Sequence, residues 1–269
     1  MDEGTKEKNL NDNWKESGKG GRMDGVPTAI GGMMQRAYEL QQNCDDILRK
    51  CYHKDKVDEI NFPIDINKIA NVRGIRLEYA NLNFGGSEEI DLNIAQLRYE
   101  PDETGKIIRK IYVDNSQNKS YLGDNSEPYS NLQKYAIAYE LGKTIVNEES
   151  ESEISQIPIG EARRRNMHSI PYSLPKLYAR QESFEHEMCA IFLLLPLDLF
   201  FAEFYTYLNT RTISPVYMEK WIKHLSEKTE IPNYQLINGY QYIKFCACQY
   251  YQNKIMETNK KDKYWELYR

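Results

Sequence analysis

Two segments of the chain hold the polar side chains that are best placed to carry chemistry. The first reads Ala138-Tyr139-Glu140-Leu141-Gly142-Lys143, and the second begins Glu185-His186-Glu187 and runs through apolar residues to Pro196. Helical periodicity covers both segments, and residues four apart share one face of a helix, as Tyr139 and Lys143 do. A carboxylate beside such a face can act as an acid, a base or a metal ligand. We therefore take these two segments as the candidate site.

Other catalytic signatures have less support. The chain has four histidines, which are His53, His168, His186 and His224. The H-E-x-x pattern that starts at His186 ends on Ala190 instead of a second histidine. Gly85-Gly86 predicts a turn rather than a phosphate-binding loop, and the C-x-C at Cys246 lacks a second cysteine pair. A metal site completed by His168 or His186 stays open as a less favoured alternative.

The elements that must position these residues follow from the spacing of apolar side chains. That spacing predicts a helix over 33–52, a short helix between Pro63 and Gly74, strands over 75–80, 94–99 and 107–113, a buried helix from residue 129, a surface loop over 148–176 and further helices from Leu177. Three short strands in succession predict a small, mainly antiparallel meander. Ser130 and Gln133 form an S-x-x-Q pattern that predicts a capping box. Helices, three strands and more helices in this order are typical of the α+β class.

Composition divides the chain into three parts. Residues 1–32 hold seven of the 15 glycines and few aliphatic side chains, which predicts a disordered N-terminal arm. Residues 33–258 are predicted to form one domain, and residues 259–269 a charged tail. The chain starts with a charged stretch, has an odd number of cysteines, five, and its apolar run at 188–197 is too short for a membrane span. We expect a cytoplasmic protein.

The two polar segments, taken with the short helix and the strands, resemble the ImmA/IrrE (DUF955) family of metallopeptidase-like proteins. The family pattern is a helix with A-H-E-L-G-H, followed by a helix with E-x-x-A-x-x-F-A-x-x-L-L-M-P or a close variant. The resemblance covers about residues 60–240. It implies a mostly helical, zincin-like α+β domain with a small three-stranded sheet and C-terminal helices. It also implies kinship with zinc peptidases that cleave repressors of mobile elements and stress regulators.

The metal-binding motif of this family is degenerate here. Tyr139 and Lys143 stand at the positions of the two histidines of H-E-x-x-H, while Glu140 stands at the general base and Glu185 at the third metal ligand. An ammonium group has no lone pair and repels a dication. A tyrosine binds metal only after it loses a proton with a pKa of about 10. We therefore expect no metal and no cofactor, and we interpret the chain as a pseudoenzyme whose Glu140 is inactive.

The loss of a metal would leave the Glu185 carboxylate as an uncompensated charge, which is costly in a protein interior. A cation, Lys143, stands where a metal ligand is lost. We therefore expect Lys143 to pair with Glu185, with Glu140 or with both. The alternative is that Lys143 extends to solvent from an ordinary helix.

The function that we favour from the sequence is a catalytically inactive module for protein binding or regulation. By the resemblance, its partner would be a repressor or another regulator protein. One alternative is an active zinc metallo-endopeptidase with unusual ligands, which would bind zinc. Another is a DNA-binding regulator. The sequence does not determine the oligomeric state.

Charge argues against nucleic acid as a partner. The chain has 35 Lys and Arg against 40 Asp and Glu, a formal net charge of -5. Residues 214–258 hold a junction that resembles a helix–turn–helix, but their five Lys, four Glu and no Arg give a net charge of only +1. Proteins that bind DNA concentrate positive charge to neutralise several phosphates.

Overall fold

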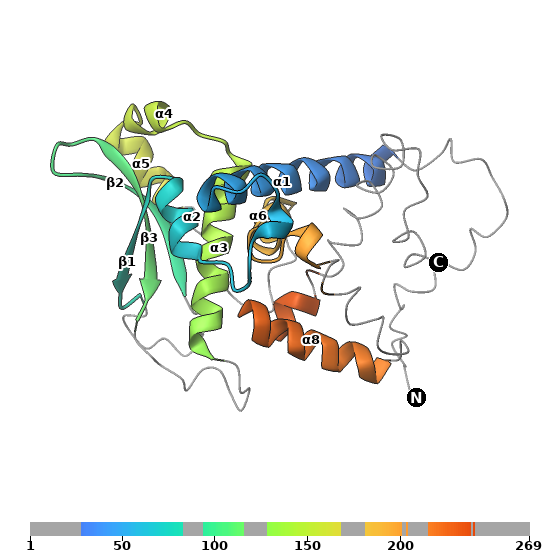
Figure 1. Cartoon of the computed structure of the whole chain (residues 1–269). Coiled ribbons are helices and arrows are strands. Elements are labelled where there is room, and N and C mark those ends of the chain that lie inside the picture. The colour runs from blue at the N-terminus through green and yellow to red at the C-terminus, as the bar shows by residue number, and fades with distance from the viewer. Residues whose placement is uncertain are drawn as a thin grey trace, which may run out of the picture. The chain divides into compact units, whose positions relative to one another are not determined.

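The fold is known from a computed structural model that describes residues 28–82, 94–115, 128–167, 181–200, 203, 215–237 and 239 (Figure 1). Its elements are α1 (Thr28–Tyr52), a 3-10 helix (Val57–Glu59), α2 (Ile66–Val72), β1 (Ile75–Ala80), β2 (Ala95–Pro101), β3 (Ile107–Asp114), α3 (Tyr129–Val146), α4 (Glu151–Ser155), α5 (Ile159–Met167), α6 (Gln181–Leu194) and α8 (Pro215–Thr229). The mostly helical α+β class predicted from the sequence is confirmed. Met34–Arg269 form one compact unit, and the features below belong to it.

The sheet is mixed, with the strand order β1-β3-β2. β2 runs antiparallel to β3, from Ala95 opposite Val113 to Pro101 opposite Ile107. β1 runs parallel to β3. The predicted meander is therefore wrong, because β1 pairs with the third strand and not with the second. The short turn at Asp102–Gly105 keeps β2 and β3 together, whereas the longer connection from β1 lets β2 lie on the far side of β3.

α3 is the central helix of this unit (Figure 1). It lies between the sheet and α6, and it contacts both. Eleven of its 18 residues are buried, which confirms the prediction of a helix that is apolar on most sides. The facing part of α6 and the turn after it are buried without a break from Glu187 to Leu197. The candidate residues on both helices are therefore held by the core.

The segment predicted as a surface loop, 148–176, contains two helices. α4 begins with a capping box in which Ser150 Oγ accepts the Glu153 N–H at 3.2 Å and Glu153 Oε2 accepts the Ser150 N–H at 2.9 Å. The prediction was wrong because this capping box lies inside a run of alternating Glu and Ser, and such a composition is typical of an exposed loop. The basic run on α5 meets the acidic run, since Arg165 pairs with Glu149.

Two predicted boundaries also differ from the structure. The first helix begins at Thr28, inside the predicted arm, while residues 1–27 and the tail 259–269 lie outside the described residues. Pro128 is the N-cap residue of α3, so the predicted capping box does not form. The Gln133 amide instead donates to the Asp114 carbonyl at 2.6 Å, which ties the start of α3 to the end of β3.

The predicted helix–turn–helix junction lies at the end of α8. Glu230 has a positive φ of 59°, and a second helical segment begins at residue 233. Trp221, Leu225, Ile231 and Leu236 are buried in the common core. This part of the chain is therefore a packing element of the domain. No helix among the described residues is long and apolar enough to cross a membrane.

Candidate functional site

The two polar segments meet because α3 and α6 approach each other closely at Gly142. A Cβ added at Gly142 would lie 2.6 Å from the His186 carbonyl oxygen and 3.1 Å from the Cys189 Cβ. Any larger residue would push the helices apart, so glycine is required here by packing. The contact places Tyr139 and Lys143 of α3 beside the start of α6, while Glu140 turns to β2.

Glu140 is the best-satisfied carboxylate of the site. It is 3% exposed, and its Oε2 accepts the backbone N–H of Leu97 on β2 at 2.7 Å. The Lys143 Nζ donates to Oε1 at 2.7 Å and to Oε2 at 2.8 Å. The Lys143 side chain is 17% exposed and therefore does not extend freely into solvent. Both oxygens of Glu140 are thus occupied by donors from the chain itself.

Glu185 is compensated by a different cation. The guanidinium of Arg36 on α1 donates to Glu185 Oε2 from Nε at 3.0 Å and from Nη2 at 2.9 Å. Of the two pairings expected for Lys143, the structure contains the one with Glu140, while Glu185 pairs with Arg36. Sequence reasoning missed Arg36, because a partner 149 residues away leaves no local signal.

His186 faces α3, although its neighbour Glu185 faces α1. Its ring meets the Tyr139 ring edge to face, with centroids 5.7 Å apart and an interplanar angle of 88°. Burial, helped by the charge of Lys143, lowers the pKa of His186 to about 4, so the imidazole is neutral at pH 7. Among the other histidines, His53 and His224 are exposed on other elements, and His168 lies outside the described residues.

The outer edge of β2 is closed by side chains of the same protein. Beside the Leu97 N–H, which donates to Glu140, the Tyr99 N–H donates to Asn166 Oδ1 at 2.9 Å. The Asn166 Nδ2 in turn donates to the Tyr99 carbonyl at 3.0 Å. These are the backbone groups with which an extended peptide would otherwise pair at a strand edge. Sequence reasoning missed Asn166 because it lies on α5, where a loop was predicted.

The residues of the site do not fit a zinc ion. Catalytic zinc takes three His, Asp, Glu or Cys ligands and keeps one position for water. Here Lys143 is a protonated amine and Tyr139 a protonated phenol, and the Lys143 ammonium already occupies the carboxylate of Glu140. Within the described residues, no group of three His, Cys, Asp or Glu side chains is arranged to hold a metal.

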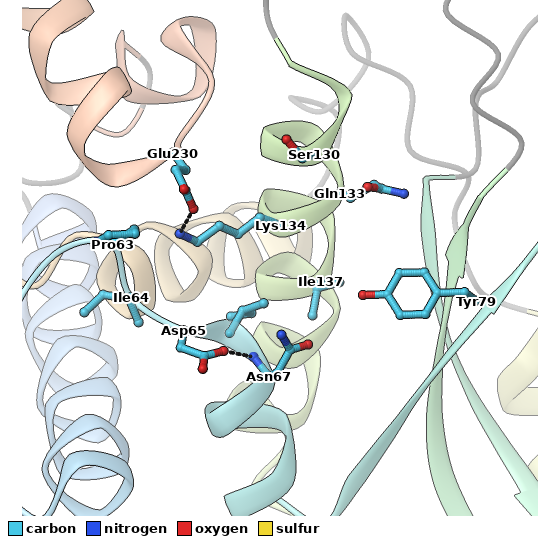
Figure 2. Close-up of a pocket in the computed structure, with 11 residues that line it drawn as sticks. Pro63, Ile64, Asp65, Asn67, Tyr79, Ser130, Gln133, Lys134, Ile137 and Glu230 are labelled. Carbon is cyan, nitrogen blue, oxygen red and sulfur yellow. Dashed lines mark hydrogen bonds and ion pairs between the residues drawn. The ribbon is translucent and has the colours of Figure 1, made fainter.

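A pocket of about 450 Å³ lies apart from these residues, at the other edge of the sheet (Figure 2). Its walls come from the start of α2, from β1, from one face of α3 and from Glu230 after α8. Its volume is in the range of small-ligand or side-chain pockets. No pattern in the sequence groups its residues, because they come from four separate segments.

Comparison with known proteins identifies no relative of this chain. No family model matches the chain, and no curated protein or solved structure does either. The likeness to the ImmA/IrrE family therefore stays an interpretation of the two motifs and their order.

Proposed function

We propose that this protein is a non-catalytic, peptidase-like module that binds another protein and acts in regulation. The observation that carries the proposal is the state of Glu140, whose two oxygens accept hydrogen bonds from Lys143 and from the Leu97 N–H. The interpretation as a zincin-like domain of the ImmA/IrrE type is part of the proposal. So is a cytoplasmic location.

The arrangement of Glu140 is unsuitable for general-base catalysis. A general base must reach the proton of a water or substrate within hydrogen-bond distance. Glu140 is almost fully buried, and its oxygens already accept from a backbone amide and an ammonium group. The neighbouring edge of β2, where an extended substrate would lie, is occupied by Asn166. The proposal of a module without hydrolytic activity follows from these contacts.

The identity of the partner is inferred from the resemblance. Family members of this kind act on repressors and other regulator proteins. A chain that keeps such a fold and loses the chemistry could still bind a regulator without cleaving it. We therefore propose a repressor or regulator protein as the partner. The closed site argues against an active zinc peptidase, and the buried side chains that follow α8 argue against a DNA-reading element there.

Metal content is the experiment that tests this proposal. The full chain is purified, exposed to zinc, freed of unbound metal and measured by elemental analysis. We expect much less than one zinc per chain, because Lys143 and Tyr139 replace the ligands. The double variant Tyr139→His with Lys143→His is expected to gain zinc, since it restores two ligands four residues apart on one helix face.

Two controls make the metal measurement decisive. Glu185→Ala in the double variant is expected to lower the zinc content again, because it removes the third ligand position. Stoichiometric zinc in the natural protein, lost on Glu185→Ala alone, would overturn the proposal in favour of an active metallopeptidase. A double variant that is folded but stays free of metal would argue against the zincin-like interpretation.

A further inference from the structure

We propose that the outer edge of β1 accepts an extended peptide segment of a partner protein. The segment would add to the sheet as a strand and place one side chain in the pocket shown in Figure 2. This inference rests on the proposed protein-binding function, to which it assigns a site. It concerns the edge of the sheet that is opposite Glu140 and Lys143.

β1 is an open edge within the described part of the chain. The strand order β1-β3-β2 leaves it with one strand neighbour, β3, over the register from Ile75 opposite Arg109 to Ala80 opposite Asp114. An edge strand presents a row of backbone N–H and C=O groups that can pair with another chain. The other edge, on β2, does not offer this row, because Glu140 and Asn166 occupy it.

The pocket lies on the face of β1 that looks toward α3. Tyr79 of β1 points across the pocket toward Ile137 of α3 (Figure 2). Tyr79 shares its face of β1 with the buried Ile75, yet Tyr79 itself is 58% exposed. A strand added beside β1 would place the side chain opposite Tyr79 on the same face, within about 5 Å between Cβ atoms. That side chain would enter the pocket.

The lining of the pocket favours a neutral side chain with an apolar stem and a polar end. Ile64 and Ile137 supply apolar wall, and Tyr79 supplies an aromatic ring. The hydroxyls of Tyr79 and Ser130 and the side-chain amide of Asn67 supply polar groups to the same lining. A Gln or Tyr side chain of the peptide would provide apolar contact and pair with these groups.

The charges of the lining disfavour an acidic side chain. Among the lining residues, Lys134 is the one cation, and its Nζ already donates to Glu230 Oε2 at 2.8 Å and to the Thr229 carbonyl at 3.1 Å. The carboxylates of Asp65 and Glu230 both border the pocket. An Asp or Glu of the peptide would therefore meet two like charges and no free cation.

The test uses a display library of random peptides of about ten residues, the length of a long strand. The library is selected on the immobilised full chain, and enriched peptides are synthesised and titrated by fluorescence anisotropy. We expect Tyr79→Ala to weaken binding about tenfold or more, since it removes the aromatic wall. The matched control is Ile159→Ala, which removes another exposed apolar side chain, on α5, and is expected to leave the affinity unchanged.

Backbone methylation of the peptide tests the mode of binding. A strand added to an edge turns alternate N–H groups toward its neighbour. We expect N-methylation at one alternate set of positions to abolish binding, and N-methylation at the other set to be tolerated. Amide hydrogen exchange of the bound protein should show new protection in residues 75–80 and no change in residues 95–101.

Each outcome of this test decides the proposal. Binding that is lost with Tyr79→Ala and with only one methylated set supports it. A library without enriched peptides overturns it. Binding that is equally strong with either set of positions methylated also overturns it, because it would indicate a ligand in the pocket without strand addition. Protection that maps to another surface overturns the β1 site but leaves the protein-binding function standing. Stoichiometric zinc in the separate metal assay would instead remove the proposed function.

Discussion

The two edges of the sheet differ in whether side chains of the same protein form hydrogen bonds with their backbone groups. On β2, the N–H groups of Leu97 and Tyr99 donate to the side chains of Glu140 and Asn166. On β1, the described part of the chain supplies a strand neighbour on one side, and a pocket adjoins Tyr79. The comparison indicates that side chains of the same protein hold the edge beside Glu140. Within the described residues, the opposite edge has no second strand, and we propose that it binds a peptide.

The ion pairs near the two edges also differ in how deeply they are buried. At the β2 edge, the charges of Glu140 and Lys143 are largely buried and pair with each other. At the pocket, Lys134 pairs with Glu230, whose side chain is 49% exposed. Buried pairs are costly to break, because removing one partner leaves an uncompensated charge, whereas exposed pairs contribute little. The comparison therefore predicts large effects on stability at β2 and small ones at β1.

The largest expected effect comes from Lys143→Met. It leaves the Glu140 carboxylate buried without its counter-ion, so we expect a loss of about 3–5 kcal/mol in the free energy of unfolding. Urea unfolding followed by circular dichroism measures it. Adding Glu140→Gln to this variant should recover most of the loss. A cost below about 1 kcal/mol for Lys143→Met would mean that the pair does not hold the β2 edge closed.

The next effect comes from Asn166→Ala. It removes two hydrogen bonds to the backbone of Tyr99, and we expect a loss of about 1–3 kcal/mol. The amide of Tyr99 should also exchange faster with solvent, while amides of β1 keep their rates. Ser152→Ala on the exposed side of α4 serves as a control with little expected change. Unaltered exchange at Tyr99 would contradict the closed edge.

A smaller effect is expected from pH, through His186. The folded pKa of about 4 lies below the ordinary value of 6.5, so the unfolded chain takes up a proton first as the pH falls. Stability contributed by neutral His186 is therefore present above pH 6.5 and lost as the pH falls toward 4. We expect a loss of about 1 kcal/mol between about pH 7 and about pH 5.5, which His186→Gln removes from the unfolding profile. Identical profiles for both proteins would refute the burial of a neutral imidazole.

The smallest effect is expected at the open edge. Tyr79→Ala should change the free energy of unfolding by no more than about 0.5 kcal/mol, because the ring is mostly exposed. Thermal unfolding measures it, and the same variant then serves in the peptide assay. A large loss of stability would show that Tyr79 is part of the core. The two edges would then be alike.

Periodicity within single segments carried much of the sequence-based prediction. It indicated the helix from residue 129, the three strands and the helical stop at Gly74, whose φ is 64°. It also placed Glu140 and Lys143 on one helix. These features depend on neighbours within one or two turns, so a pattern of apolar residues is sufficient to find them.

The strand order, the Arg36–Glu185 pair and the closure of β2 by Asn166 required the tertiary structure. Each joins segments that are far apart along the chain, and many pairings of such segments satisfy the same local pattern. The choice among them follows from how α3 packs between the sheet and α6, which Gly142 permits. The sequence alone determined that Tyr139 and Lys143, and not histidines, flank Glu140 on this helix. Tertiary packing decided that Arg36 compensates Glu185 and that the Leu97 N–H reaches Glu140, because only packing brings distant charges and backbone groups within hydrogen-bond distance.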